Sequence, residues 1–407
     1  MMATILLIGT LDTKGIEFAF VRDLIIQRGH RTIVMDAGVS AEPAFQPDIA
    51  AGEVAEAGGT TLTHLREAQD RGAAISAMSI GAAKLTAELN ETGEIDGILG
   101  LGGSGGTSIA SAAMKALPVG FPKLIVSTLT SGDISPYVGV KDLTMMYSVV
   151  DVAGLNSISR RVFTNAVGAI CGMVEQPAPE GEDKPIIAAT MFGVTTPCVT
   201  RAREDLEANG YEVLVFHATG SGGKAMEGLI EDGYVRAVAD ITTTEWCDEL
   251  VGGVLSAGPT RLEAAAKAGI PQVVSVGALD MVNFWAIDTV PAAFKDRTLY
   301  KHNDQVTLMR TTPAECAELG RIIAEKLNRA TGPTALFIPL KGVSMIDAVG
   351  QPFYSPEADA ALFQALRDNL DAEKVTLIEL DLHINDPAFA DSMSAKLLEM
   401  IEDKSGD

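Results

Sequence analysis

Residues 100–108 read GLGGSGGTS and form the segment best suited to holding a ligand through its backbone. They follow a short apolar run and precede an amphipathic segment, so we expect a strand to end and a helix to begin here. Glycine inside such elements costs roughly 0.5–1 kcal/mol relative to alanine, so a cluster needs a reason. Bare backbone N–H groups at a helix start attract phosphate, which predicts an anion site. A tight turn needed only for packing is the alternative.

Two standard phosphate motifs match this segment only in part. Gly100, Gly102 and Gly105 fit the dinucleotide pattern G-x-G-x-x-G, but the next strand ends in Ser and Thr rather than in an acid. The P-loop pattern fails because Thr107 stands where its lysine should follow the last glycine. The segment GSGGK at 220–224 has a lysine but lacks the first glycine. The sequence therefore favours an anion-binding turn that is neither a dinucleotide-binding motif nor a P-loop.

Two further turns offer polar groups. In GTLDTKG, residues 9–15, Thr10 and Thr13 supply hydroxyls and Asp12 a carboxylate. Lys14 stands at a predicted helix start, where the helix dipole disfavours cations, so we expect it to face an anionic ligand. Alternatively, Asp12 or Thr13 only caps the helix and Lys14 is solvated. The third turn is TLTSGD, residues 128–133.

The second half places titratable side chains after its predicted strands. Histidine with carboxylates and an arginine suits acid–base chemistry on an anionic substrate. Each histidine taken alone is more often structural. A metal at Asp280 lacks the support of an H-x-x-x-H pair, and without a G-x-S-x-G elbow a serine hydrolase is not expected. The candidate catalytic residues are His217, Glu245, Arg261, Asp280 and His302.

Short apolar runs must position these turns. Most are the length of strands buried on both faces, and amphipathic stretches separate them, which predicts an α/β fold with parallel sheets. Ligand-binding turns of such a sheet meet at the carboxyl edge of the strands. The predicted strands are TILLIG, TIVMDAG, GILGLGG, KLIVSTL, IIAATMFG, VLVFHATG, RAVADITTT, GGVLSAG, PQVVSVG, TALFIPL and VTLIELDL.

The length of 407 residues favours two domains. Residues 176–185, QPAPEGEDKP, lack apolar periodicity and read as a linker. Strand, turn, helix and strand follow one another similarly in residues 5–40 and 186–223. We therefore predict two doubly wound, Rossmann-like domains, 1–180 and 181–407, facing a cleft.

The composition disfavours some classes of binding partner. A net charge of −23 disfavours nonspecific binding to nucleic acid or to an anionic membrane. No run reaches the roughly 18 apolar residues of a membrane span, and the N-terminus lacks signal-peptide features. The 4 cysteines form no C-x-x-C pair, which suggests free thiols and a cytoplasmic protein.

Several of these segments, in this order, resemble one family, that of the tomato tobamovirus-resistance protein, whose bacterial and fungal relatives are called ATP-binding domain proteins. The segments are GTLDTKG, DAGVS, GLGGSGGTS, FPKLIVST with SGD, and SVVDVAGLNSISRRVFTNA. Later segments, HNDQVTLMRTTPAE and KGVSMIDAVGQPFYSPEADAALF, also resemble bacterial members, so the resemblance covers essentially the whole chain.

The resemblance implies a two-subdomain α/β protein that binds ATP with Mg²⁺ in its N-terminal half and self-associates. In an ATP-dependent enzyme, Asp12 would position the Mg²⁺. By motif match, the implied nucleotide contacts are Gly9, Thr10, Asp12, Thr13, Lys14, Gly102, Gly103, Ser104, Gly105, Gly106, Thr107, Ser131 and Gly132.

Three functions stay open. The first is an ATP-dependent enzyme acting on a small anionic metabolite at the interdomain cleft, with Lys14 neutralising phosphate and His217 as base. The second is a nucleotide-sensing module without turnover, in which ATP biases closure or assembly. The third is an ATP-independent lyase or hydrolase acting in the second half.

Overall fold

The computed structural model describes residues 2–177 and 184–405, and the chain divides into two compact units, Met1–Gly181 and Glu182–Asp407. Residues 178–183, the centre of the predicted linker, and with them the predicted boundary at residue 180, lie outside the described residues.

The first domain is built on a five-stranded sheet in which all neighbours run parallel, in the order β2-β1-β3-β4-β5. Its inner strands β1, β3 and β4 are buried along their whole length, as their apolar sequences predict. The strands are β1 (Thr4–Gly9), β2 (Arg31–Asp36), β3 (Gly97–Gly102), β4 (Lys123–Ser127) and β5 (Thr144–Tyr147).

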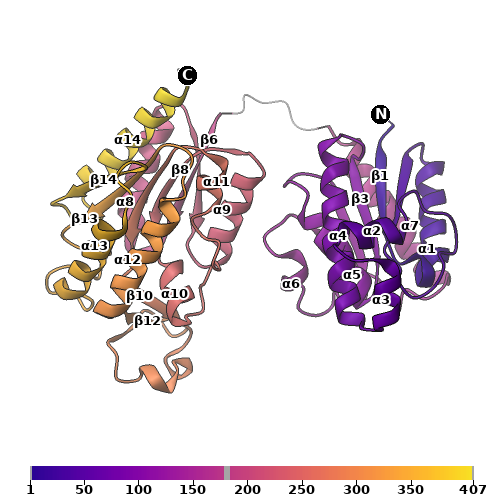
Figure 1. The fold of residues 1–407 in the computed structure, drawn as a ribbon, viewed down its shortest axis with the longest axis horizontal. Coiled ribbons are helices and arrows are strands. Elements are labelled where there is room, and N and C mark those ends of the chain that lie inside the picture. Colours follow the sequence, from indigo (N-terminus) through magenta and orange to yellow (C-terminus); the bar gives the residue numbers. More distant parts are fainter. Residues whose placement is uncertain (1, 178–183, 406–407) are drawn as a thin grey trace. The chain divides into compact units, whose positions relative to one another are not determined.

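Helices cover both faces of this sheet (Figure 1). Alternate strand residues point to opposite faces. Leu6 and Ile8 pack with α2 to α5, whereas Ile5 and Leu7 pack with α1 and α7. The helices are α1 (Leu11–Gln27), α2 (Ala51–Ala57), α3 (Leu62–Ala68), α4 (Arg71–Glu91), α5 (Ser104–Lys115), α6 (Ser135–Val138) and α7 (Ser157–Glu175).

The second domain repeats this plan with a six-stranded parallel sheet in the order β14-β13-β9-β8-β6-β7. One face packs against α8 and α14, and the other against α9 to α13. The strands are β6 (Ile186–Met191), β7 (Glu212–His217), β8 (Val235–Thr242), β9 (Gln272–Gly277), β13 (Thr334–Pro339) and β14 (Val375–Leu380). The helices are α8 (Thr196–Ala208), α9 (Ser221–Glu231), α10 (Glu245–Val251), α11 (Ala264–Ala268), α12 (Pro313–Leu327), α13 (Pro356–Asn369) and α14 (Pro387–Ser405).

A small antiparallel sheet, absent from the sequence prediction, follows β9. Its order is β10-β12-β11, with β10 (Met281–Phe284), β11 (Leu299–Lys301) and β12 (Thr307–Arg310). The predicted strand GGVLSAG is wrong, because α10 ends at Val251 and the chain then continues without strand pairing. Gly252 adopts a left-handed conformation there, with φ of 91°, and so ends the helix. The described part of this domain also contains short 3₁₀ turns at Gly193–Thr195, Ile287–Thr289 and Ala292–Phe294.

The prediction of two parallel-sheet α/β domains is confirmed by these two sheets. In the described part of the chain, no helix is both long and apolar enough to cross a membrane. Cys171, Cys198, Cys247 and Cys316 are all free and buried.

Candidate functional site

A pocket of about 940 Å³ opens at the carboxyl ends of β1 and β3. In the order β2-β1-β3-β4-β5, the direction of strand succession reverses between these two strands. Turns on either side of such a reversal diverge, which leaves a crevice where ligands bind in doubly wound folds. The polar lining residues are Thr10, Asp12, Thr13, Lys14, Ser40, Arg66, Gln69, Asp70, Arg71, Ser104 and Asp151, and the backbone of Gly102, Gly103, Gly105 and Gly106 joins them.

The glycine-rich turn has two structural glycines and one that the fold leaves free. A Cβ on Gly102 would lie 2.9 Å from the Cα of Gly106, and one on Gly106 would lie 3.2 Å from the carbonyl oxygen of Leu101. A Cβ on Gly103 would find only the hydroxyl of Thr128, at 3.8 Å. Packing therefore explains Gly102 and Gly106 but not Gly103.

The start of α5 offers backbone donors to the pocket. Gly103 is the N-cap, and no side chain caps the helix. The first amides of a helix have no partner within it, so here they are available to a ligand. Thr107, predicted as a contact, instead points away, because its hydroxyl lies 2.7 Å from that of Ser127 and is fully buried.

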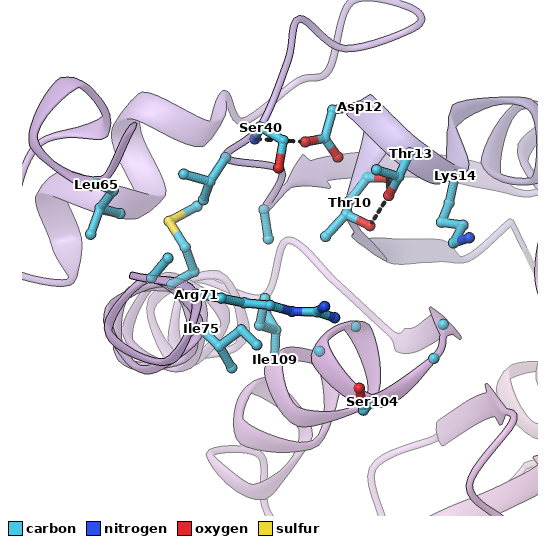
Figure 2. A pocket seen from close by; sticks show the side chains of 18 of the residues that line it. Thr10, Asp12, Thr13, Lys14, Ser40, Leu65, Arg71, Ile75, Ser104 and Ile109 are labelled. Atoms are coloured by element: carbon cyan, nitrogen blue, oxygen red, sulfur yellow. Dashed lines mark hydrogen bonds between the residues drawn. The ribbon is translucent and has the colours of Figure 1, made fainter. Parts of the chain in front are cut away.

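The turn after β1 forms the opposite side of the pocket (Figure 2). The hydroxyls of Thr10 and Thr13 lie 2.8 Å apart. Lys14 departs from helical geometry inside α1, with φ of −126° and ψ of 15°. Gly9 does not line the pocket; a Cβ there would lie 2.2 Å from the ring of Phe18. Its role in this structure is close packing.

Asp12 is partly committed to the protein itself. Its Oδ2 accepts hydrogen bonds from the backbone N–H groups of Ser40, at 2.8 Å, and Ala41, at 3.3 Å. Its Oδ1 is buried and has no partner among the described residues. Neighbouring Asp36 accepts hydrogen bonds from Leu11 and Gly38, and burial, with the nearby charge of Asp12, raises its pKa. One oxygen of Asp12 thus holds the loop after β2, and the other is uncommitted.

The structure adds residues that sequence reasoning missed. Arg71 extends from the start of α4 toward the first turn of α5 (Figure 2). Asp70 caps α4 by accepting hydrogen bonds from the next N–H groups, and Asp151 follows β5. The only sequence signal for the first two was an N-cap residue before a helical pattern. Conversely, Ser131 and Gly132 do not line this pocket.

In the second domain, Glu245 and Arg261 come together, but they satisfy each other. The Arg261 Nε donates to Glu245 Oε2 at 2.7 Å, and its Nη groups donate to Asp240 at 2.5 and 2.6 Å. Glu227 adds a third carboxylate at 3.3 Å. Arg261 is 1% exposed, and Glu245 also accepts the two backbone N–H groups of Gly220 and Gly223.

Asp280 belongs to a different buried cluster. Its Oδ2 accepts a hydrogen bond from the Ser344 hydroxyl at 2.7 Å, while its Oδ1 has no partner among the described residues. Arg310 lies 2.7 Å from Asp359 and 3.5 Å from Asp347. Burial, with the charge of Asp347 next in size, raises the pKa of Asp280 to about 7, and burial raises that of Asp359 to about 7.

The two candidate histidines are exposed and belong to neither cluster by any hydrogen bond or ion pair among the described side chains. The ring of His217 stacks on Phe192 with 5.4 Å between centroids. The backbone N–H of His302 bonds to Val306 in the turn between β11 and β12. The five catalytic candidates therefore do not form one site in this structure, and their catalytic roles stay predictions.

Among the described residues, no group of three or more histidine, cysteine, aspartate or glutamate side chains is arranged to hold a metal ion. A metal at Asp12 would need most of its ligands from a bound molecule and water.

Both halves of the chain match family models. Residues 3–179 match the Uncharacterised protein family (UPF0261) N-terminal domain, and residues 184–401 match its C-terminal domain. The chain belongs to the UPF0261 family. It is 58% identical over 399 residues to a UPF0261 protein of Clostridium tetani, covering 98% of this chain and 99% of that one.

A plant relative confirms the resemblance to the tobamovirus-resistance family. The ToMV resistance protein Tm-1(GCR237) of Solanum lycopersicum is 45% identical over 337 residues, covering 81% of this UPF0261 chain and 45% of the plant protein. Among solved structures, a putative UDP-N-acetylglucosamine 2-epimerase from Listeria monocytogenes aligns with 67% of this chain and 79% of its own, at a TM-score of 0.25 and 11% identity. This last similarity is too low to inform ligand or activity.

Proposed function

We propose that this UPF0261 protein binds ATP, together with Mg²⁺, in the pocket of its first domain. The observation that supports this most is the combination of an uncapped, glycine-walled helix start with unpaired cationic side chains in one pocket. The identity of the nucleotide comes from the resemblance of GTLDTKG and GLGGSGGTS to ATP-binding domain proteins.

The pocket has the two surfaces that a nucleotide needs. Backbone amides at the start of α5, with Lys14 and Arg71, suit phosphates. Apolar side chains suit a base, and the volume of about 940 Å³ lies within the range of small-molecule sites. The apolar lining residues are Ala37, Val39, Leu65, Ala74, Ile75, Met78 and Ile109.

The residues present also fit Mg²⁺ bound with a nucleotide. Magnesium usually takes one or two carboxylates from the protein and its other ligands from phosphates and water. Asp12 offers an uncommitted oxygen, and Asp151 lines the same pocket. We therefore assign Asp12, with Asp151 as a second carboxylate, to this role; the ion would neutralise phosphate charge.

The second domain offers fewer free polar groups for catalysis than its sequence predicted. Glu245 and Arg261 are buried and paired with each other, so neither offers a free group to a metabolite. His217 is exposed and remains the candidate base. ATP-dependent chemistry on an anionic metabolite predicts substrate-dependent ADP or AMP release that is lost in His217→Ala. The same experiment distinguishes an enzyme from a nucleotide-sensing module, because only the enzyme releases ADP or AMP. Self-association of the protein stays a prediction under both hypotheses.

Gly103→Val tests the binding proposal. Because a Cβ at Gly103 has open space and its φ is −84°, the variant should fold normally, yet its side chain would stand where phosphate approaches the amides. We expect Mg-ATP titration to give saturable binding for the natural protein. For the variant we expect a Kd at least about 10-fold weaker, which corresponds to a loss of about 1.4 kcal/mol of binding free energy.

Gly193→Val is the matched control. Gly193 occupies the turn after β6, and a Cβ there has nothing within 4 Å. This variant should bind Mg-ATP like the natural protein, which a thermal shift can also report, since ligand at 100 times its Kd adds about 2.7 kcal/mol of stability. Absence of saturable binding by the natural protein, with and without Mg²⁺, would overturn the proposal.

A further inference from the structure

Two cationic side chains in the pocket have no protein partner. Among the described residues, neither Lys14 nor Arg71 makes a side-chain hydrogen bond or an ion pair. Arg66, the third cation of the lining, is different, because its guanidinium donates to the carbonyl oxygens of Val39 and Ala41. Lys14 and Arg71 are therefore the cations left for a ligand.

The carboxylates of the lining do not neutralise them. Asp12 and Asp70 each accept two backbone hydrogen bonds, from residues 40 and 41 and from residues 72 and 73 respectively. Asp151 is exposed at the turn after β5 and makes no ion pair among the described residues. Both unpaired cations stand near helix starts, where the dipole repels positive charge, so an anion would relieve an unfavourable arrangement.

Arg71 lies where the apolar wall meets the glycine turn. Ile75 stands one helical turn further along α4. A Cβ on Gly105 would lie 3.2 Å from Ile75 Cδ1 and 3.8 Å from Arg71 Nη2. The guanidinium and the apolar side chain therefore both border the first turn of α5. A group bound by Arg71 would be directly next to whatever packs on Ile75.

Lys14 belongs to the polar side of the pocket. It lies on α1 beside the hydroxyls of Thr10 and Thr13, and it approaches the glycine turn from another direction than Arg71 does (Figure 2). The apolar residues of the lining come mainly from α3, α4 and α5 and none from α1. The lining thus changes from apolar at α3 and α4, through the amides of α5, to polar at α1.

This change from an apolar to a polar lining would orient an elongated ligand. If the proposed function is correct, that ligand is the nucleotide. We propose that the base packs on Leu65, Ile75 and Met78, that the first phosphate lies beside Arg71 at the start of α5, and that the terminal phosphate lies beside Lys14. Arg71 then contributes to binding of any nucleotide with at least one phosphate, whereas Lys14 selects nucleoside triphosphates over monophosphates.

Titration of AMP and Mg-ATP against Arg71→Met and Lys14→Met tests the orientation. A hydrogen bond to a charged group corresponds to roughly 10- to 100-fold in affinity. Arg71→Met should weaken AMP and ATP by similar factors in this range. Lys14→Met should weaken ATP by such a factor and leave AMP within about 3-fold, so that the ATP-to-AMP preference falls at least about 10-fold.

Lys84→Met is the control, because Lys84 is exposed on α4 and does not line the pocket. It should change neither affinity, and unfolding of all three variants without nucleotide should match the natural protein. The orientation is overturned if Lys14→Met weakens AMP as much as ATP, if Arg71→Met affects ATP alone, or if the natural protein binds ATP but not AMP. A natural protein that binds neither would instead overturn the proposed function.

Discussion

The two domains share one sheet topology but use its strand reversal differently. In the first, the reversal between β1 and β3 opens a pocket, and the turns there supply bare glycine backbone and unpaired cations. In the second, the reversal lies between β6 and β8. There β8 ends at Thr242, the chain continues with Thr243 and Thr244, and all three residues are fully buried.

Paired charges account for much of the difference. In the second domain the carboxylate of Glu245 accepts hydrogen bonds from the backbone N–H groups of Gly220 and Gly223 near the start of α9. The carboxylate of Glu245 thus occupies the backbone N–H groups that would otherwise be available to an anionic ligand. Arg261 is similarly saturated by carboxylates, whereas Arg71 has none among the described residues. An arginine near a helix start indicates a ligand only when no carboxylate of the chain already holds it.

Arg261→Met should have the largest effect on stability. It removes the only cation in contact with Asp240, Glu245 and Glu227 among the described side chains, which leaves buried carboxylates uncompensated. Breaking a buried pair in this way costs about 3–5 kcal/mol. Urea unfolding should show the loss, and Arg321→Met, which breaks exposed ion pairs, should cost at most about 1 kcal/mol. Similar stabilities for both variants would mean that the buried network is not structural.

Asp280→Asn should change the pH dependence of the second domain. Because the folded pKa of Asp280 is raised from 3.8 to about 7, folding takes up a proton between these two pH values. The free energy of unfolding therefore falls as the pH rises from 3.8 to about 7. One such proton corresponds to a slope of up to about 1.4 kcal/mol per pH unit.

The neighbours that set this pKa are Arg310, Asp347, Asp359 and Ser344. Asp248 and Asp359, whose pKa values burial also raises to about 7, should keep part of the slope in the variant. We therefore expect the variant to match the natural protein at about pH 3.8 and to gain stability relative to it as the pH rises to about 7, as measured by urea unfolding. An unchanged pH profile would show that Asp280 is ionised throughout.

Arg71→Met should have the smallest effect on stability in the absence of nucleotide. Its guanidinium has no partner to lose among the described residues, so the free energy of unfolding should change by less than about 0.5 kcal/mol. The same chemical change thus separates the two domains. A loss of several kcal/mol would mean that Arg71 supports the fold, and the contrast with Arg261 would disappear.

The α/β class and the main elements of both parallel sheets can be predicted from the amino-acid sequence alone. Short apolar runs bounded by glycine and polar turns mark buried parallel strands, and this local pattern located the strands of both parallel sheets except β5. It failed for GGVLSAG, where Gly252 ends α10, and for the short strands β10 to β12, whose pairing is antiparallel and partly distant. The pocket's glycine turn and Lys14 were also predicted from sequence, because a strand-to-helix turn is a local feature.

Which charged side chains lack a partner depends on contacts between distant parts of the chain. Arg71 is 33 residues before Ser104 in the numbering, so nothing in the local sequence places it beside α5. Likewise, Glu245 and Arg261 look like catalytic candidates until folding brings each against the other and removes both from solvent. Whether a side chain binds a ligand or the protein depends on its neighbours in space, and long-range packing of helices on the sheet sets those neighbours.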